Sequence, residues 1–150
     1  MRTVVITGGN KGLGLAQTAT FLERGFDVHV VSRSKGDLST LQSQNLHWHE
    51  HDLSDWSDVS YLETIENAVG AIDVLVNNAG VHLKKPVWDV SADELQPVLD
   101  LNINAMFLAC GRFCALNKDR GGAIVNISSM GGLMALPSAA AYVTAKTAVI

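Results

Sequence analysis

The sequence is poor in charge, in aromatic residues and in cysteine. Charged residues make up 17% of the 150 residues and aromatic residues 6%, whereas apolar residues reach 47%. The formal net charge is −4, so we expect no broad basic surface for nucleic acid or acidic membranes. This balance is typical of a single α/β domain, here over residues 1–150, that buries a hydrophobic core.

Targeting segments are also missing from the sequence pattern. Apolar strand residues begin at Val4 with no charged and apolar leader before them, so we expect no signal peptide. No apolar run approaches the length that crosses a membrane. We therefore predict a cytoplasmic protein with neither a membrane nor a nucleic acid as its partner.

The two cysteines, Cys110 and Cys114, are four residues apart in a helical pattern. They could form a redox or metal-binding pair. The absence of Cys-x-x-Cys spacing favours two buried thiols that pack as small apolar side chains. With no leader either, we expect no disulfide.

A glycine-rich turn near the N-terminus organises the rest of the chain. Val4-Val5-Ile6 predicts a short strand, Thr7–Gly14 (TGGNKGLG) follows at once, and apolar residues at helical spacing continue from Leu15. Glycines let the backbone approach a ligand closely, and a helix N-terminus attracts negative charge. The pattern predicts a pyrophosphate site, with a tight turn that binds nothing as the alternative.

Strands and helices alternate along the chain. The predicted strands are 3–7, 27–32, 46–51, 72–77 and 123–128, and the predicted helices are 13–24, 36–42, 54–69, 91–116 and 138–150. Repeated β-α-β units imply a doubly wound parallel sheet of the Rossmann type, for which we predict the strand order 3-2-1-4-5.

Several local signals set the expected helix boundaries. Ser54 is the expected cap of one helix and Gly70 its stop signal. Ser91 and Glu94 form a capping box for another. Pro97 falls inside that second helix, where we expect it to kink the first turns or shift the helix start.

The end of the second strand bears on the choice between NAD and NADP. A carboxylate there would hold the ribose hydroxyls of NAD, but the sequence reads Ser32-Arg33. Arg33, Lys11 and Ser32 could bind a 2′-phosphate through charge-assisted hydrogen bonds. We therefore favour NADP over NAD, with ordinary surface cations as the alternative. The missing carboxylate also argues against a methyltransferase of similar fold.

Two further strand ends face the same expected crevice. Asp52 could accept a hydrogen bond from an adenine amine or could be a turn residue before Ser54, and its spacing does not decide between them. Asn77–Gly80 (NNAG) follows a nearly continuous apolar strand. Small and amide residues there allow close approach and can bridge neighbouring strands, although a simple turn is the alternative.

Tyr142 and Lys146 are four residues apart on a predicted helix, so they share a face. A free phenol loses its proton only near pH 10, and a neighbouring ammonium favours the phenolate. Such a pair could exchange a proton with an oxygen during hydride transfer, and Ser129 at the fifth strand end could hold that oxygen. An amphipathic surface helix is the plainer reading of the pair alone.

Together these motifs resemble the short-chain dehydrogenase/reductase family, in its branch with three residues between Gly8 and Gly12. The resemblance covers essentially all 150 residues. It implies that Tyr142 is the general acid/base, that Lys146 lowers the phenol pKa and binds the nicotinamide ribose, and that Ser129 positions the substrate oxygen. It also implies that Asn102 anchors a proton-relay water.

The family resemblance therefore predicts a carbonyl/alcohol oxidoreductase that uses NADP. Its small-molecule substrate is not specified. The expected cofactor-binding residues are Thr7, Gly8, Asn10, Lys11, Gly12, Leu13, Gly14, Ser32, Arg33, Asp52, Leu53, Asn78, Ala79, Gly80, Tyr142 and Lys146.

The C-terminus departs from the family pattern. The chain stops at Ile150 within a predicted helix that has no cap, so we expect the C-terminal strands and the loop that shapes the substrate pocket to be missing. A non-catalytic cofactor-binding or interaction module is the alternative function. For the full-length form the resemblance implies a homo-oligomer.

His47, His49 and His51 alternate along the third strand and share one face. Three such histidines could bind a metal ion. No cysteine or acidic partner is fixed by the spacing, so we expect a half-buried or solvated strand face and no metal. The glycine turn also lacks the Gly-Lys-Ser/Thr of a nucleoside-triphosphate loop.

Overall fold

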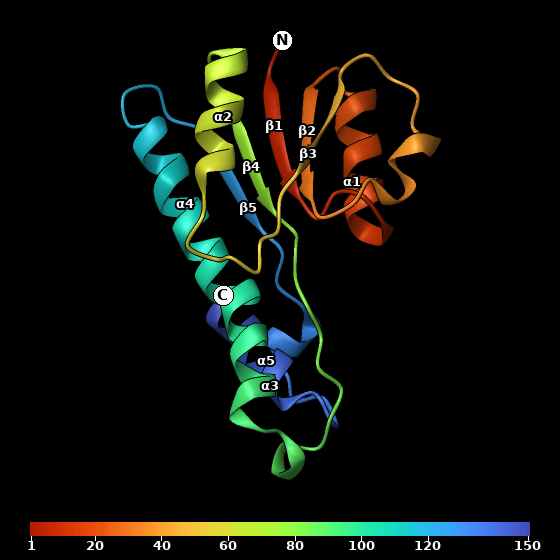
Figure 1. The fold of residues 1–150 in the computed structure, drawn as a ribbon, viewed down its shortest axis with the longest axis vertical. Coiled ribbons are helices and arrows are strands. Elements are labelled where there is room, and N and C mark those ends of the chain that lie inside the picture. The colour runs from red at the N-terminus through yellow and green to blue at the C-terminus, as the bar shows by residue number, and fades with distance from the viewer.

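Five parallel strands form the centre of the protein, in the order β3-β2-β1-β4-β5 (Figure 1). This computed structural model describes residues 1–150. The valine-rich runs become strands because they are covered on both faces, and every residue of β1 is buried. The predicted strand order is confirmed. The strands are β1 Thr3–Thr7, β2 Asp27–Ser32, β3 Leu46–Glu50, β4 Val74–Asn77 and β5 Ala123–Asn126.

Helices cover both faces of the sheet, with α1 on one side and α2 and α4 on the other (Figure 1). Phe21 and Leu22 of α1 pack against the buried cluster that contains Val28 on the first face. Leu62 of α2 and Phe113 of α4 are buried on the second. The helices are α1 Gly12–Glu23, α2 Ser60–Val69, α3 Ala92–Leu99, α4 Ala105–Leu116 and α5 Ala140–Ala148.

The start of α2 differs from the predicted one. Turns occupy the chain from Leu53 to Ser57, and the helix begins at Ser60. Asp58 supplies the local signal, because its carboxylate accepts a hydrogen bond from the Ser60 amide at 2.9 Å. The predicted stop is confirmed, since Gly70 ends the helix with φ of 84°, which favours glycine.

The helix from Ala92 to Leu116 is continuous but changes geometry midway. α3 begins at Ala92, directly after Ser91, which is the N-cap of the predicted Ser91–Glu94 capping box, so Pro97 does not shift its start. Three residues beyond Pro97, the stretch Asp100–Asn104 forms a π-helical turn before α4. The irregularity thus lies after the proline and not in the first turns.

This combined helix also corrects the expectation that no segment is long and apolar enough to cross a membrane. Over its 25 residues, Ala92–Leu116 reaches a mean hydropathy of 1.3, which meets that test by length and composition alone. In the structure its two halves pack against α5, α2 and β4, as expected for a helix of an α/β layer.

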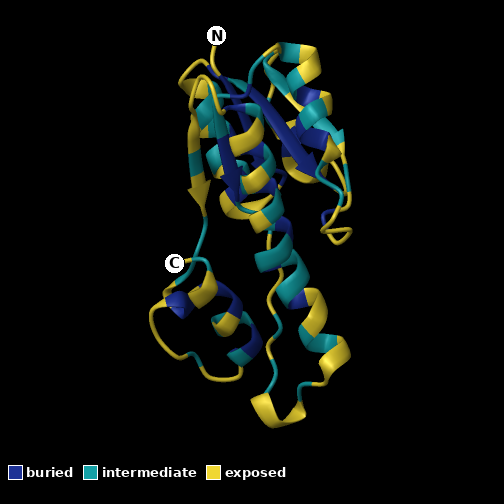
Figure 2. Cartoon of the chain, turned by 90° about the vertical axis from the view of Figure 1, so that its left-hand side faces the viewer, coloured by how far each residue is buried: buried dark blue, intermediate teal, exposed yellow.

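The segment after β5 forms a smaller lobe below the sheet with α3 (Figure 2). Val98 of α3 packs against Ala141 and Ala145 of α5 in a small apolar cluster. The cysteines near the sheet are both free, and Cys114 is exposed, which corrects the expectation that both are buried. Burial raises the pKa of the partly buried Cys110 thiol.

The capping box of α3 gives a pH-dependent prediction. Lys85 donates to both Glu94 oxygens at 2.8 and 2.7 Å, and together with the Ser91 amide it lowers the pKa of Glu94 to about 2. Glu94→Gln keeps the cap but loses the charge. Its melting temperature should therefore be lower than that of the parent near neutral pH.

This difference should shrink as the pH falls below the ordinary glutamate pKa of 4.5. A lowered folded-state pKa gives stability that is complete above the unfolded pKa and is lost as pH falls through the folded one. Circular-dichroism melts at pH 7 and at lower pH measure the difference. Asp93→Asn is the matched control, and a gap for Glu94→Gln that stays constant with pH would contradict the charge argument.

Candidate cofactor cleft and catalytic helix

A cleft of about 680 Å³ opens at the carboxyl ends of the strands. The chain runs outward from β1 to β3 on one side and from β4 to β5 on the other, so this is the switch point where such folds bind ligands. Its volume suits a cofactor-sized ligand. Most predicted cofactor residues line it: Gly8, Asn10, Lys11, Gly12, Leu13, Gly14, Ser32, Arg33, Asp52, Leu53, Asn78, Ala79 and Gly80.

The glycine turn leaves the N-terminus of α1 open toward this cleft. Lys11 is the N-cap, but no side chain caps the helix and the first turn has no acidic residue. The unpaired N–H groups and the positive end of the helix dipole therefore face the cleft. This arrangement fits a pyrophosphate, as the turn pattern predicts.

Gly14 is the glycine that packing requires most strictly. A Cβ there would overlap the Gly8 carbonyl oxygen and lie 2.6 Å from Asn78 Nδ2. We expect Gly14→Ala to lower the free energy of unfolding by about 1–3 kcal/mol, because the turn must shift to make room. It should also weaken NADPH binding, measured by fluorescence titration, because the same turn forms the phosphate site.

Gly111→Ala is the matched control for this substitution. A Cβ at Gly111 in α4 meets nothing within 4 Å, so this variant should gain about 0.5–1 kcal/mol from helix propensity. Urea unfolding compares the two variants. Equal stability of Gly14→Ala and the parent would contradict the close approach of the turn to Asn78.

Asn78 joins the two central strands at the switch point. Its amide nitrogen Nδ2 donates to the Thr7 and Gly8 carbonyls at 3.1 and 3.0 Å. The Thr7 hydroxyl oxygen accepts from the amides of Asn78 and Ala79. The bridging role predicted for this strand end is thus present. Thr7 is buried beneath the turn, so its hydroxyl is engaged within the protein.

Arg33 and Lys11 are exposed side chains on the wall of the same cleft. Neither forms an ion pair, so both are available to an anionic ligand. Ser32 differs from the prediction, because its hydroxyl donates to the Ser34 carbonyl at 2.8 Å and accepts from Trp48. The Ser32 hydroxyl hydrogen is therefore already engaged in a hydrogen bond within the protein.

Asn10 ties the glycine turn to the segment that carries Arg33. Its Nδ2 donates to the Ser34 carbonyl at 3.0 Å, and its own carbonyl accepts from the Asp37 amide at 2.9 Å. The side chain is buried. Asn10 thus positions the cleft wall and fixes the direction in which Arg33 leaves the sheet.

Asp52 has the turn role, and its adenine contact stays a prediction. Its Oδ1 accepts from the Ser54 amide at 3.0 Å and from the Ser54 hydroxyl at 2.7 Å, which is a turn role. These hydrogen bonds lower the pKa of the Asp52 carboxyl, with a smaller contribution from Arg33. The carboxylate is exposed on the cleft wall, while Leu53 beside it is buried.

Asn102, Gly80 and Lys146 converge at the other end of the cleft. Asn102 is only 2% exposed, and its Nδ2 donates to the Val98 and Val81 carbonyls. A Cβ on Gly80 would lie 2.6 Å from Asn102 Oδ1 and 3.5 Å from Lys146 Nζ. The cleft wall, the π-helical turn and α5 therefore meet at Gly80.

Lys146 is buried and held in place by the chain after β5. Its Nζ donates to the Ile127 carbonyl at 2.7 Å, and burial lowers the pKa of this amine. The Ser128 hydroxyl donates to the Lys146 carbonyl at 2.8 Å. The ammonium thus has a fixed position close to Gly80 of the cleft wall.

Tyr142 lies one helical turn before Lys146, and the amine is 5.9 Å from the centre of its ring. The ring of His82, from the loop after β4, lies against it in a tilted arrangement, with the ring centres 4.5 Å apart. Ser129 Oγ accepts from the Gly131 amide at 3.1 Å, which leaves the Ser129 hydroxyl hydrogen free. The structure therefore brings Tyr142 and Lys146 together and leaves Ser129 able to donate.

Sequence reasoning missed several cleft residues. His51 directly follows β3, and Ser34, Ser54 and Val81 lie two to four residues beyond a strand end, so their closeness to strand ends could have identified them. Pro97 and Leu101 reach the cleft from the long helix, and no pattern in the sequence marks them. The contact between the His82 and Tyr142 rings depends on the path of the loop after β4, which the sequence does not reveal.

The comparison with known families decides the assignment. The family model described as short chain dehydrogenase matches residues 2–150. The chain belongs to the short-chain dehydrogenase family. This confirms the resemblance carried by the glycine turn, the NNAG segment and the Tyr142–Lys146 pair.

Two curated family members illustrate the similarity. The NADP-dependent (R)-specific alcohol dehydrogenase of Lentilactobacillus kefiri is 32% identical over 99% of this chain and 62% of its own length. The NADPH-dependent pterin aldehyde reductase of Arabidopsis thaliana is 35% identical over 99% and 64%. The chain thus spans less than two thirds of these relatives.

Solved structures of the family share the fold closely. A 4-hydroxyisoleucine dehydrogenase complexed with NADH superposes with a TM-score of 0.89 at 32% identity, over 99% of this chain and 63% of that one. ElxO with NADP bound gives 0.90 at 29% identity, over 99% and 63%. One of these structures holds NADH and the other holds NADP, so the family alone does not determine the nucleotide that this chain prefers.

Proposed function

We propose that this protein, within its complete domain, interconverts a carbonyl and an alcohol using NADP(H). The observation that carries the proposal is the placement of Lys146. Its buried amine lies beside Gly80 of the cleft wall and on the same helix as Tyr142. The cofactor cleft would thus lie next to the Tyr142–Lys146 pair at Gly80. Hydride transfer to a carbonyl needs the cofactor and the proton donor to be this close.

The cleft residues fit the parts of a dinucleotide. The open N-terminus of α1 suits the pyrophosphate, and Asp52 is available to the adenine. Arg33 and Lys11 suit a 2′-phosphate because both are unpaired cations on the cleft wall. When bound, the reduced cofactor would give the hydride in carbonyl reduction, and the oxidised cofactor would accept it in alcohol oxidation.

The chain's own residues would then transfer the proton to or from the substrate oxygen. Ser129 donates its free hydroxyl hydrogen to the substrate oxygen and holds it near Tyr142. Tyr142 gives its proton to that oxygen in reduction and takes one in oxidation. The ammonium of Lys146 favours the phenolate that forms. Asn102 has a buried Oδ1 with no partner, which suits a water that returns protons to the pair.

The experiment follows NADPH oxidation by the purified protein with a panel of ketones and aldehydes. Turnover of at least one carbonyl, with alcohol formed in equal amount, would support the proposal. NADPH binding without turnover across the panel would instead favour a cofactor-binding module that lacks catalysis.

A further inference from the structure

A cluster of histidines and one carboxylate lies on β2 and β3. His29 pairs with His47 in the parallel register of these strands, so their side chains leave the same face of the sheet. Asp27 precedes His29 by two residues and therefore shares that face. The partner that the spacing along β3 could not supply thus comes from the neighbouring strand.

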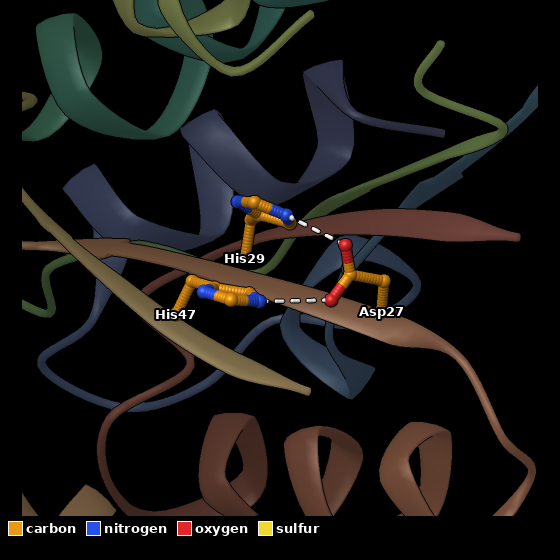
Figure 3. A group of neighbouring side chains, drawn as sticks. All are labelled: Asp27, His29 and His47. Carbon is orange, nitrogen blue, oxygen red and sulfur yellow. Dashed lines mark hydrogen bonds and ion pairs between the residues drawn. The ribbon is translucent and has the colours of Figure 1, made fainter. Parts of the chain in front are cut away.

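The His29 and His47 rings stack on each other, and the Asp27 carboxylate lies beside them with one oxygen directed at each ring (Figure 3). Asp27 Oδ2 lies 3.3 Å from His29 Nε2, and Oδ1 lies 2.9 Å from His47 Nε2. The available ligand atoms all lie within 4.8 Å of one another. Ligands about 2.0–2.2 Å from a tetrahedral metal ion are about 3.3 Å apart. Small side-chain movements would therefore bring all three ligand atoms within bonding distance of one ion.

We propose that Asp27, His29 and His47 form a binding site for a borderline divalent ion such as Zn²⁺. Two imidazoles and one carboxylate suit such ions, whereas Mg²⁺ and Ca²⁺ prefer oxygen ligands alone. An ion can enter from solvent, because the His47 side chain is 44% exposed and that of Asp27 is 16% exposed. Water can fill the remaining position.

His49 gives an independent reason for a ligand at this point. Its Nε2 lies 2.8 Å from His29 Nδ1, and His29 is only 3% exposed. Without an ion, the carboxylate can only accept, so His29 Nε2 carries the proton. With an ion on Nε2, the proton moves to His29 Nδ1 and is donated to His49 Nε2, while His49 carries its own on Nδ1. A second hydrogen-bonding group behind a ligating histidine is the usual support of a metal site.

The site is separate from the cofactor cleft. Asp27 begins β2 and Ser32 ends it, which places them about 16 Å apart at about 3.3 Å per residue. The bound ion would join β2 to the edge strand β3 and so stabilise the sheet without touching the cleft. Metal binding and NADPH binding should therefore be independent.

The experiment titrates the EDTA-treated protein with ZnCl₂ by calorimetry. We expect one ion per chain with a Kd of about 1 µM or tighter, a higher melting temperature with ZnCl₂, and no binding of MgCl₂. His47→Gln and Asp27→Asn should each weaken Zn²⁺ binding at least about tenfold, as expected when a ligand is lost. His82→Gln, which changes a histidine outside the cluster, should bind as the parent does.

A second measurement distinguishes this site from loose binding at surface histidines. Co²⁺ bound by the parent should give visible absorption that His47→Gln lacks, while circular dichroism shows that the variant is folded. Zn²⁺ binding weaker than about 100 µM, or binding of equal affinity in His47→Gln, Asp27→Asn and the parent, would overturn the proposal.

Discussion

Replacing Tyr142 with phenylalanine should remove most of the turnover and leave NADPH binding nearly unchanged. The phenol oxygen is the only group that this substitution removes, and the ring can keep its contact with His82 at 4.5 Å. Loss of a positioned general acid/base costs about 10²–10⁴-fold in rate. We therefore expect kcat to fall by that factor, with the Kd for NADPH within about twofold of the parent.

Tyr61→Phe is the natural control, because the chain has only these two tyrosines. Tyr61 is buried in α2 within the core that faces the sheet, and its hydroxyl has no hydrogen-bond partner among those formed by the chain. Burial raises its pKa, so this phenol does not exchange protons near neutral pH. Turnover should be the same in Tyr61→Phe and the parent. Equal activity in both variants would remove Tyr142 from its proposed role.

Much of the fold was predictable because the decisive signals are local. The apolar runs at Val4 and Val28 are strands because parallel strands are buried on both faces. The glycine turn and the Ser91–Glu94 capping box each fix a helix start through residues within one turn. Where a boundary was wrong, as at Ser54, a neighbouring residue of similar chemistry, Asp58, supplied the same hydrogen bond instead.

The missed features depend on contacts between distant segments. Asn10 positions the Arg33 segment through the Ser34 carbonyl, and nothing in the glycine turn shows that its side chain points there. The π-helical turn places Asn102 against Gly80, whereas the sequence pattern could only suggest a disturbance near Pro97. Such contacts depend on how distant segments pack together, and residue spacing along the chain does not predict them.

The histidines on β3 show the same limit in another form. Spacing along one strand placed His47 and His49 on a common face but could not supply an acidic partner. The parallel register with β2 brings Asp27 and His29 beside them. A one-residue change of register would move both to the opposite face, so the cluster exists only because the sheet is paired as observed.

Replacing Arg33 with aspartate should reverse the preference between the two nucleotides. Arg33 is an exposed, unpaired cation where β2 meets the cleft. A hydrogen bond to a charged group contributes about 1.5–3 kcal/mol, so NADPH affinity should fall about tenfold to a hundredfold. NADH should bind as well as before or better, because a carboxylate at this position accepts from the ribose hydroxyls.

Arg24→Asp carries the same change of charge at the opposite end of α1, where Arg24 is the C-cap. A general effect of net charge would weaken NADPH binding equally in both variants and would vanish at high salt. If Arg33 contacts the 2′-phosphate specifically, only Arg33→Asp would lose NADPH affinity, and its NADH affinity would not fall. Fluorescence titration with both nucleotides measures these affinities. Equal binding of NADPH and NADH by the parent would contradict the role given to Arg33 and Lys11, because two unpaired cations beside a 2′-phosphate must favour the nucleotide that carries it.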